Sequence, residues 1–221
     1  MERKYEFTHE TKDRCGRTLH RIVAVRDFSN VKAGDKGGWI EKESNLSHEG
    51  NCWVRDHAMV FGNAQVYGNA RVYGTAQVFG DAQIFGDAQV FGNTQVFGNT
   101  QVFGNTQVLG NTQVCENARV YENAQVSGEA RVSGNARVYG SAEVCGTADV
   151  GSDRDYIVFK NWWSSGRYFT WTRSNNLWRV GCFYGTGEEL IRKAYKDSEE
   201  SGREYERIVR YVDEILKAED E

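Results

Sequence analysis

The chain has no proline, few histidines, few cysteines and no long apolar run among its 221 residues. Its five cysteines are an odd number without Cys-x-x-Cys spacing, which disfavours a disulfide framework and a zinc site. Reduced thiols fit the cytoplasm, and the first residues lack the apolar run of a secretory signal. No stretch approaches the roughly 20 apolar residues of a membrane span, so we expect no membrane insertion.

Histidine is scarce and confined to the first quarter of the chain, at His9, His20, His48 and His57. A zinc centre held by three histidines is therefore disfavoured, and we predict no metal and no resident cofactor. The formal net charge is −4, which argues against a general basic surface for DNA or anionic membranes.

A six-residue repeat occupies the middle of the chain. Val or Ile recurs at every sixth position from Val54 to Val150, preceded two residues earlier by a small residue, usually Ala or Thr. Gly follows two residues later at 13 of the 15 positions from Gly62 to Gly146, and Glu116 and Glu122 are the exceptions. A short fixed period of this kind is typical of a β-solenoid.

Three six-residue sides would close one turn, so the repeat predicts about six coils. Alternation directs the small residue and Val inward and Gln outward, while Gly-Asn turns each corner. We predict an N-terminal β cap at residues 1–45, the solenoid at 46–150 and an α+β domain at 151–221. The cap is expected to contain strands at 5–8 and 19–25, joined by a loop that carries Asp13 and Gly16.

One corner of the predicted prism carries a line of aromatic residues spaced 18 apart. The line consists of Tyr67, Phe85, Phe103, Tyr121 and Tyr139. One interpretation is ring stacking within the chain. The other is a seam between copies, because apolar surface of that extent usually contacts something.

Residues 151–221 change character and predict a strand at 155–160, a hairpin at 167–183 and two helices. Thr186 with Glu189 and Ser201 with Glu204 are capping-box pairs, each expected to start a helix.

The hairpin combines aromatic residues with arginine, as a nucleotide site requires. Alternation predicts that Arg167, Phe169, Trp171 and Arg173 share one face. The predicted ligand site comprises Arg167, Phe169, Trp171, Arg173, Trp178 and Arg179. The competing interpretation is an aromatic core with solvated arginines.

The six-residue unit resembles the hexapeptide repeat of left-handed β-helix proteins, the fold of many bacterial acyltransferases. Several stretches further resemble the YdcK-like family and related bacteriophage proteins. These stretches are Leu19–Asp27, Val31–Asp35, Gly37–Ile40, Asn45–Ser47 and, at the C-terminal end, Val180–Thr186. The resemblance implies a left-handed β-helix and a homo-oligomer, most often a trimer.

The residues and the resemblance leave three functions open. The leading hypothesis is a non-catalytic, phage-type binding protein whose C-terminal domain captures a host protein or a phosphorylated small molecule such as a signal nucleotide. The alternative is a CoA-dependent acyltransferase with His57 or His48 as general base, because histidine titrates near neutrality. The third is a structural spacer, for example in a virion.

Overall fold

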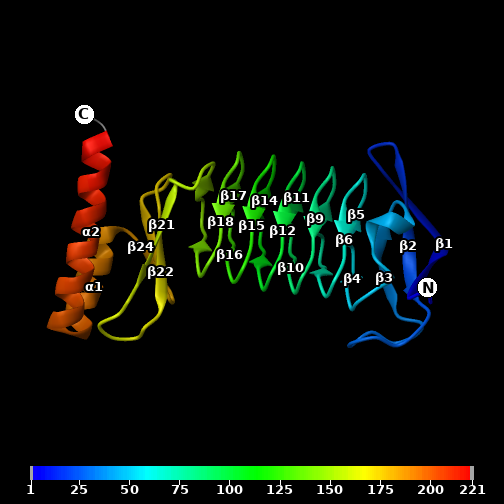
Figure 1. The fold of residues 1–221 in the computed structure, drawn as a ribbon, viewed down its shortest axis with the longest axis horizontal. Helices are drawn as coiled ribbons and strands as arrows, with labels where there is room; N and C mark the ends of the chain where they lie inside the picture. Colours follow the sequence, from blue (N-terminus) through cyan, green and yellow to red (C-terminus); the bar gives the residue numbers. More distant parts are fainter. Residues whose placement is uncertain (1, 220–221) are drawn as a thin grey trace.

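The chain forms a straight prism that is closed at each end by a different structure (Figure 1). The computed structural model describes residues 2–219. An N-terminal hairpin covers one end, and a small sheet with two helices covers the other. The predicted β-solenoid of about six turns with a small C-terminal α+β domain is confirmed.

Three parallel sheets form the walls of the prism, and each strand pairs with the strand 18 residues further on. The β20 wall contains β5 (Met59–Val60), β8 (Gln77–Val78), β11 (Gln95–Val96), β14 (Gln113–Val114), β17 (Arg131–Val132) and β20 (Asp149–Val150). The β19 wall contains β4 (Trp53–Val54), β7 (Arg71–Val72), β10 (Gln89–Val90), β13 (Gln107–Val108), β16 (Gln125–Val126) and β19 (Glu143–Val144). The β18 wall contains β6 (Gln65–Val66), β9 (Gln83–Ile84), β12 (Gln101–Val102), β15 (Arg119–Val120) and β18 (Arg137–Val138).

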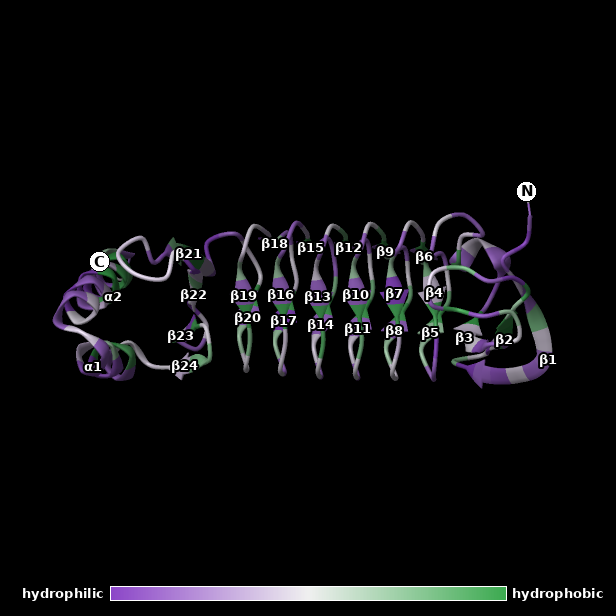
Figure 2. Ribbon diagram, turned by 90° about the horizontal axis from the view of Figure 1, so that it is seen from below, coloured by the Kyte–Doolittle hydropathy of each residue, from purple (hydrophilic) through white to green (hydrophobic). Residues whose placement is uncertain are grey.

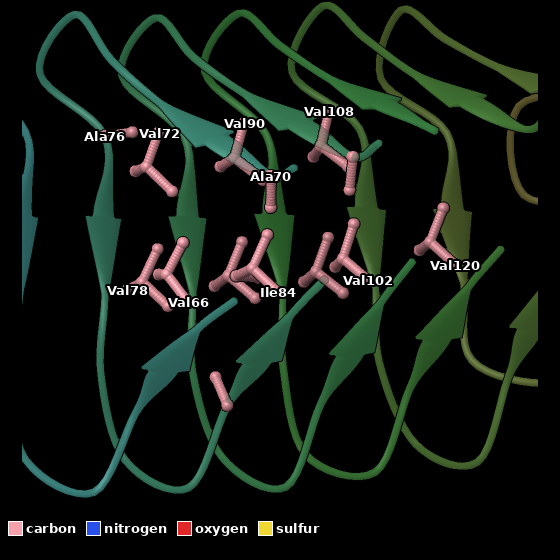
Figure 3. Packing of buried hydrophobic residues seen from close by; sticks show 14 of the residues in the cluster. Val66, Ala70, Val72, Ala76, Val78, Ile84, Val90, Val102, Val108 and Val120 are labelled. Atoms are coloured by element: carbon pink, nitrogen blue, oxygen red, sulfur yellow. The ribbon is translucent and has the colours of Figure 1, made fainter. Parts of the chain in front are cut away.

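The interior of the prism is a continuous column of small and β-branched side chains (Figure 3). The repeated Val and Ala positions are buried in every coil, as the alternation predicts. Thr94, Thr100, Thr106 and Thr112 replace Ala at the small position and are also fully buried. The Thr94 hydroxyl donates to the carbonyl of Phe91 at 2.7 Å. Hydrophilic and hydrophobic residues alternate along the strands, so purple and green segments repeat along the prism (Figure 2).

The corners require a left-handed backbone, which explains the repeated Gly. A Cβ on Gly50 would lie 2.3 Å from the Gly68 carbonyl oxygen of the next coil. Glu116 and Glu122 occupy the same conformation, with φ of 63° and 62°. Each carboxylate accepts a hydrogen bond at 2.9 Å from the backbone N–H of the glycine 18 residues later. This bond offsets the strain that a side chain meets at such a corner.

Aromatic rings stack along all three corners, not only along the predicted line. The predicted rings Tyr67, Phe85, Phe103, Tyr121 and Tyr139 stack in sequence with centroids 4.7–5.3 Å apart. The additional stacks are Phe61–Phe79–Phe97 and Tyr73–Phe91. Four rings of the predicted line are half-buried, and only Tyr139, at its end, is exposed. We call this line the Tyr139 ladder.

The N-terminal cap is an antiparallel sheet that continues into the solenoid. It contains β1 (Tyr5–Arg14), β2 (Arg17–Ala24) and β3 (Lys36–Ile40), followed by a short 3-10 turn, η1 (Glu43–Asn45). β3 pairs with β5 in parallel, so the cap and the β20 wall form one sheet. The prediction that Asp13 lies in a loop is wrong. β1 extends to Arg14 because Cys15 and Gly16, both with positive φ, make a tight turn.

The C-terminal domain is a four-stranded antiparallel sheet backed by two helices. Its elements are β21 (Tyr156–Lys160), β22 (Tyr168–Thr172), β23 (Leu177–Val180), β24 (Phe183–Gly185), α1 (Gly187–Asp197) and α2 (Glu199–Glu219). The Thr186–Glu189 capping box starts α1 as predicted. Ser201 does not start the second helix. The helix begins at Glu199, and the Ser198 hydroxyl accepts the Ser201 N–H at 3.1 Å. Neither helix within residues 2–219 is long and apolar enough to cross a membrane.

Both faces of the C-terminal sheet are covered. One face packs on the helices and the other closes the last coil of the prism (Figure 1). Three side-chain oxygens of this region accept the N–H groups of the last three strands, one from each wall. The bonds are Arg137 N–H to Asp153 at 2.7 Å, Glu143 N–H to Thr170 at 2.9 Å and Asp149 N–H to Ser174 at 2.7 Å.

Candidate ligand-binding cavity in the C-terminal domain

The predicted alternation of the hairpin is correct, but neither face is an open ligand surface. One face packs on the helices and the other on the prism. Phe169 and Trp171 point toward the helices and are 1% and 0% exposed. Thr170 points toward the prism, where its hydroxyl bonds the Glu143 amide. The sheet is therefore sandwiched, since each face is needed to bury apolar surface or to satisfy a neighbouring backbone.

The prediction that these aromatic rings form an open stacking face is wrong. Phe169, Trp171 and Trp178 are buried in the core with Leu190, Ala194 and Val209, so they do not form an open stacking face. The aromatic composition reflects the need of a small domain for large apolar side chains.

Two of the predicted arginines are also engaged elsewhere. Arg173 forms an ion pair with Glu219, and its guanidinium lies 5.8 Å from the Trp171 ring centroid. Arg179 pairs with Glu143 of the last coil at 3.0 Å. These contacts tie the sheet to α2 and to the prism. Of the predicted ligand residues, Arg167 and Phe169 line a cavity of the C-terminal domain.

That cavity has a volume of about 340 Å³ and lies between the sheet and α1. Its apolar wall comes from three strands, β22, β23 and β24, and from α1. The apolar lining residues are Phe169, Val180, Phe183, Leu190 and Ala194. Small-molecule sites have this size and a mostly apolar lining. Of these five apolar residues, sequence alternation identified only Phe169, because the other four come next to it only when α1 packs on the sheet.

Two of the three charged residues that line the cavity are cationic. Arg167 and Lys193 are exposed lining residues, and neither forms an ion pair with any part of the chain from 2 to 219. The Lys193 ammonium lies 5.5 Å from the centroid of Phe183, which holds it over the apolar wall. Asp197 is the one carboxylate in the described lining. Lys193 was missed by sequence reasoning, although it directly precedes Ala194 on the apolar stripe of α1.

A buried hydrogen bond fixes the inner side of the cavity. Asn161 donates to the Tyr205 hydroxyl at 3.0 Å, and its own oxygen accepts the Ser164 N–H at 2.9 Å. Burial raises the pKa of Tyr205, so the phenol stays protonated at neutral pH. Because the oxygen accepts from Asn161, the hydroxyl proton remains available for a ligand acceptor.

The family match lies in the prism. The family described as YdcK Beta solenoid repeat matches residues 64–80, 112–128 and 130–146. A 45-residue segment is 51% identical to the "Uncharacterized acetyltransferase YdcK" of Escherichia coli (strain K12). The prism is a YdcK-like solenoid. The matched segment covers 20% of this chain and only 14% of the length of that relative.

His48 of the YdcK-like solenoid is poorly arranged to act as a base. Its ring stacks on Tyr5 with centroids 4.3 Å apart, and its Nδ1 accepts the Lys4 backbone N–H at 3.2 Å. The proton of the neutral ring therefore sits on Nε2, which then has no lone pair to accept a substrate proton. Burial also lowers the pKa of His48. The ring serves as packing and as an acceptor for the cap.

His57 lies at an exposed corner of the solenoid, in the position that Asn holds in most repeats. Its backbone N–H bonds the Gly74 carbonyl at 2.9 Å, as other residues at this position do in their coils. His57 does not line the cavity of the C-terminal domain. The acyltransferase alternative therefore rests on a histidine with no oriented partner among residues 2–219.

The predicted oligomer seam is a continuous ladder within one chain, as the ring distances show. Whether copies associate along it stays a prediction. The same holds for the predicted trimer. Residues 2–219 contain no group of three or more His, Cys, Asp or Glu side chains arranged to hold a metal ion.

Proposed function

We propose that this protein is a non-catalytic binding protein whose C-terminal cavity captures a small anionic molecule with an apolar or ring-shaped body. A phosphorylated small molecule is the class that fits best. The observation that carries the proposal is the pairing of an apolar cavity with two cationic side chains, Arg167 and Lys193, that form no ion pair with a carboxylate among residues 2–219. Asp197 is the one carboxylate in the described lining. Arginine and lysine are the usual partners of phosphate groups.

The prism would act as a rigid support. The last coil is joined to the C-terminal sheet by three hydrogen bonds and by the Arg179–Glu143 ion pair. A domain held this firmly keeps the cavity preformed, so little ordering is needed on binding. All five cysteines are free, which suits a reducing compartment, and we propose the cytoplasm.

The test is calorimetric titration with AMP, ADP, a cyclic nucleotide, CoA and acetyl-CoA. We expect a phosphorylated ligand to bind wild-type protein. Arg167→Ala with Lys193→Ala should weaken binding about tenfold or more, because charge-assisted hydrogen bonds contribute roughly 1.5–3 kcal/mol each. Lys196→Ala is the matched control, since it removes the same charge from the same helix outside the cavity lining. Equal losses in control and double variant would point to general charge attraction.

Acetyl transfer is the second candidate, and the name of the E. coli relative favours it. It predicts tight binding of acetyl-CoA and turnover that is lost in His57→Ala. Binding of CoA that survives Arg167→Ala with Lys193→Ala would place the ligand on the solenoid and overturn the cavity proposal. A protein that binds no panel member would favour a structural spacer.

A further inference from the structure

The Tyr139 ladder ends with an open ring face. Tyr139 stacks on Tyr121 with centroids 5.3 Å apart and an interplanar angle of 10°. In the described chain no further ring stacks on Tyr139, which is 46% exposed. Each inner ring of the ladder has a partner on both sides. The end of the prism thus presents one aromatic face at the position that a sixth ring would cover.

That open face lies in a groove between the last coils and the C-terminal sheet. The groove has a volume of about 550 Å³ and is separate from the C-terminal cavity, although Tyr168 contributes to both. Three tyrosines line it, Tyr139, Tyr156 and Tyr168, with Ile157 and Val158 between them. Tyr168 is also 46% exposed. The Tyr156 hydroxyl donates to the Arg137 carbonyl at 2.7 Å, which fixes its ring.

The charged groups that line the groove are all carboxylates. Glu122 and Asp153 line it, and no lysine or arginine does. One oxygen of Glu122 accepts the Gly140 N–H at 2.9 Å, and one oxygen of Asp153 accepts the Arg137 N–H at 2.7 Å. These bonds hold both carboxylates in place and leave the second oxygen of each without a protein donor among residues 2–219. The Lys160 ammonium lies 5.8 Å from the Tyr168 centroid and does not line the groove.

We propose that this groove is a second binding site, for a small organic cation with a flat head group stacked on Tyr139. Aromatic faces attract cations through the ring quadrupole, most strongly where water is partly excluded. Flanking carboxylates add an attraction that a neutral ligand of the same shape does not receive. The ladder adds rigidity, since each ring holds the next in a parallel plane.

The experiment compares benzamidinium with benzamide, its neutral analogue of similar shape, by calorimetry on the full chain. We expect benzamidinium to bind at least tenfold more tightly. Tyr139→Leu should weaken benzamidinium about fivefold to tenfold, the range of a cation–π contact. Tyr67→Leu makes the same change at the opposite end of the ladder and should leave binding unchanged. Glu122→Gln with Asp153→Asn keeps a side-chain oxygen to accept the Gly140 and Arg137 N–H groups, and it should remove the preference for the charged probe.

Equal affinity for the two probes would overturn the proposal, as would a Tyr139→Leu variant that binds like wild type while keeping its melting temperature. Binding of an arginine-containing peptide without any binding of benzamidinium would also overturn it, in favour of a protein partner. The result is independent of the anion proposal, because Arg167→Ala with Lys193→Ala alters only the other cavity and should leave benzamidinium affinity unchanged.

Discussion

Both ends of the prism expose unpaired backbone groups, but one end lacks hydrogen-bond donors and the other lacks acceptors. In every coil the N–H of one strand donates to the carbonyl of the next coil, as in Gln65 to Ala82 at 2.9 Å. The first coil therefore has carbonyls without donors, and the last coil has N–H groups without acceptors. A buried backbone group left unpaired costs about as much as a lost hydrogen bond. Each cap must supply the missing half.

The N-terminal end supplies donors to all three walls. The Lys4 ammonium donates to the Cys52 carbonyl of the β19 wall at 2.9 Å. The Asn45 amide donates to the Ala64 carbonyl of the β18 wall at 2.8 Å, and the β3 backbone serves the β20 wall. The C-terminal end supplies acceptors instead, from Asp153, Thr170 and Ser174. A buried lysine at one end and hydroxyls at the other thus have one cause, the fixed direction of the hydrogen bonds.

The largest expected effect comes from removing the donor at the N-terminal end. Lys4 is completely buried, and burial lowers its pKa. Besides the Cys52 carbonyl, its ammonium donates to the carbonyls of Glu49 and Gly50, each at 3.4 Å. Lys4→Met keeps the volume but leaves these acceptors unpaired. We expect the free energy of unfolding to fall by about 2–3 kcal/mol, measured by urea denaturation. Met also removes the cost of burying the charged ammonium, which partly offsets the lost hydrogen bonds and keeps the expected loss from being larger.

Arg3→Met is the control for that prediction. Arg3 pairs with Glu43 on the surface, with a side chain 67% exposed, so its loss should change stability by no more than about 0.5 kcal/mol. If both variants lost the same stability, the ammonium–carbonyl contacts would not be the cause.

A smaller effect is expected from removing one acceptor at the C-terminal end. Thr170→Val preserves shape but leaves the Glu143 N–H unpaired in a partly buried position. We expect a loss of about 1–2 kcal/mol and faster hydrogen exchange of the Glu143 amide. Thr172→Val is matched, because its hydroxyl bonds Asn175 within the hairpin at 2.7 Å. If the Glu143 amide stayed protected in Thr170→Val, water would be satisfying that end of the wall.

The sequence predicted the repeated part of this comparison but not the ends. A six-residue period defines strands, corners and the inward Val column, because each repeat meets the same neighbours. The caps occur once, and nothing in the pattern marks Lys4 as buried or Thr170 as an acceptor. Alternation separated the faces of β22 correctly, but it does not reveal what covers each face.

The cavity shows the same limit. Arg167 and Phe169 lie in the predicted hairpin, whereas Lys193 and Phe183 join them only through the packing of α1 on the sheet. The sequence predicts Trp171 and Trp178 as ligand contacts because aromatic rings can stack on a nucleotide base. The same composition suits a core, and only the position of the helices distinguishes the two.

The smallest expected effect tests whether the N-terminal end alone responds to mild acid. His48 accepts the Lys4 N–H, and burial holds its pKa below the ordinary value of 6.5. Below about pH 6.5 the unfolded chain therefore binds more protons at this site than the folded chain, so stability falls as the pH drops. Above that pH the site contributes no slope. Thr170 and Ser174 at the other end carry no group that titrates there.

His48→Asn keeps a side-chain oxygen near the position of Nδ1 and removes the titration. We expect urea midpoints between pH 7 and 5 to fall less steeply in this variant than in wild type. His57→Asn, at an exposed corner that usually carries Asn, should retain the wild-type slope. If instead His57→Asn flattened the profile and His48→Asn did not, the acid response would belong to the solenoid corner. The loss of stability in mild acid would then not come from His48 in the N-terminal cap.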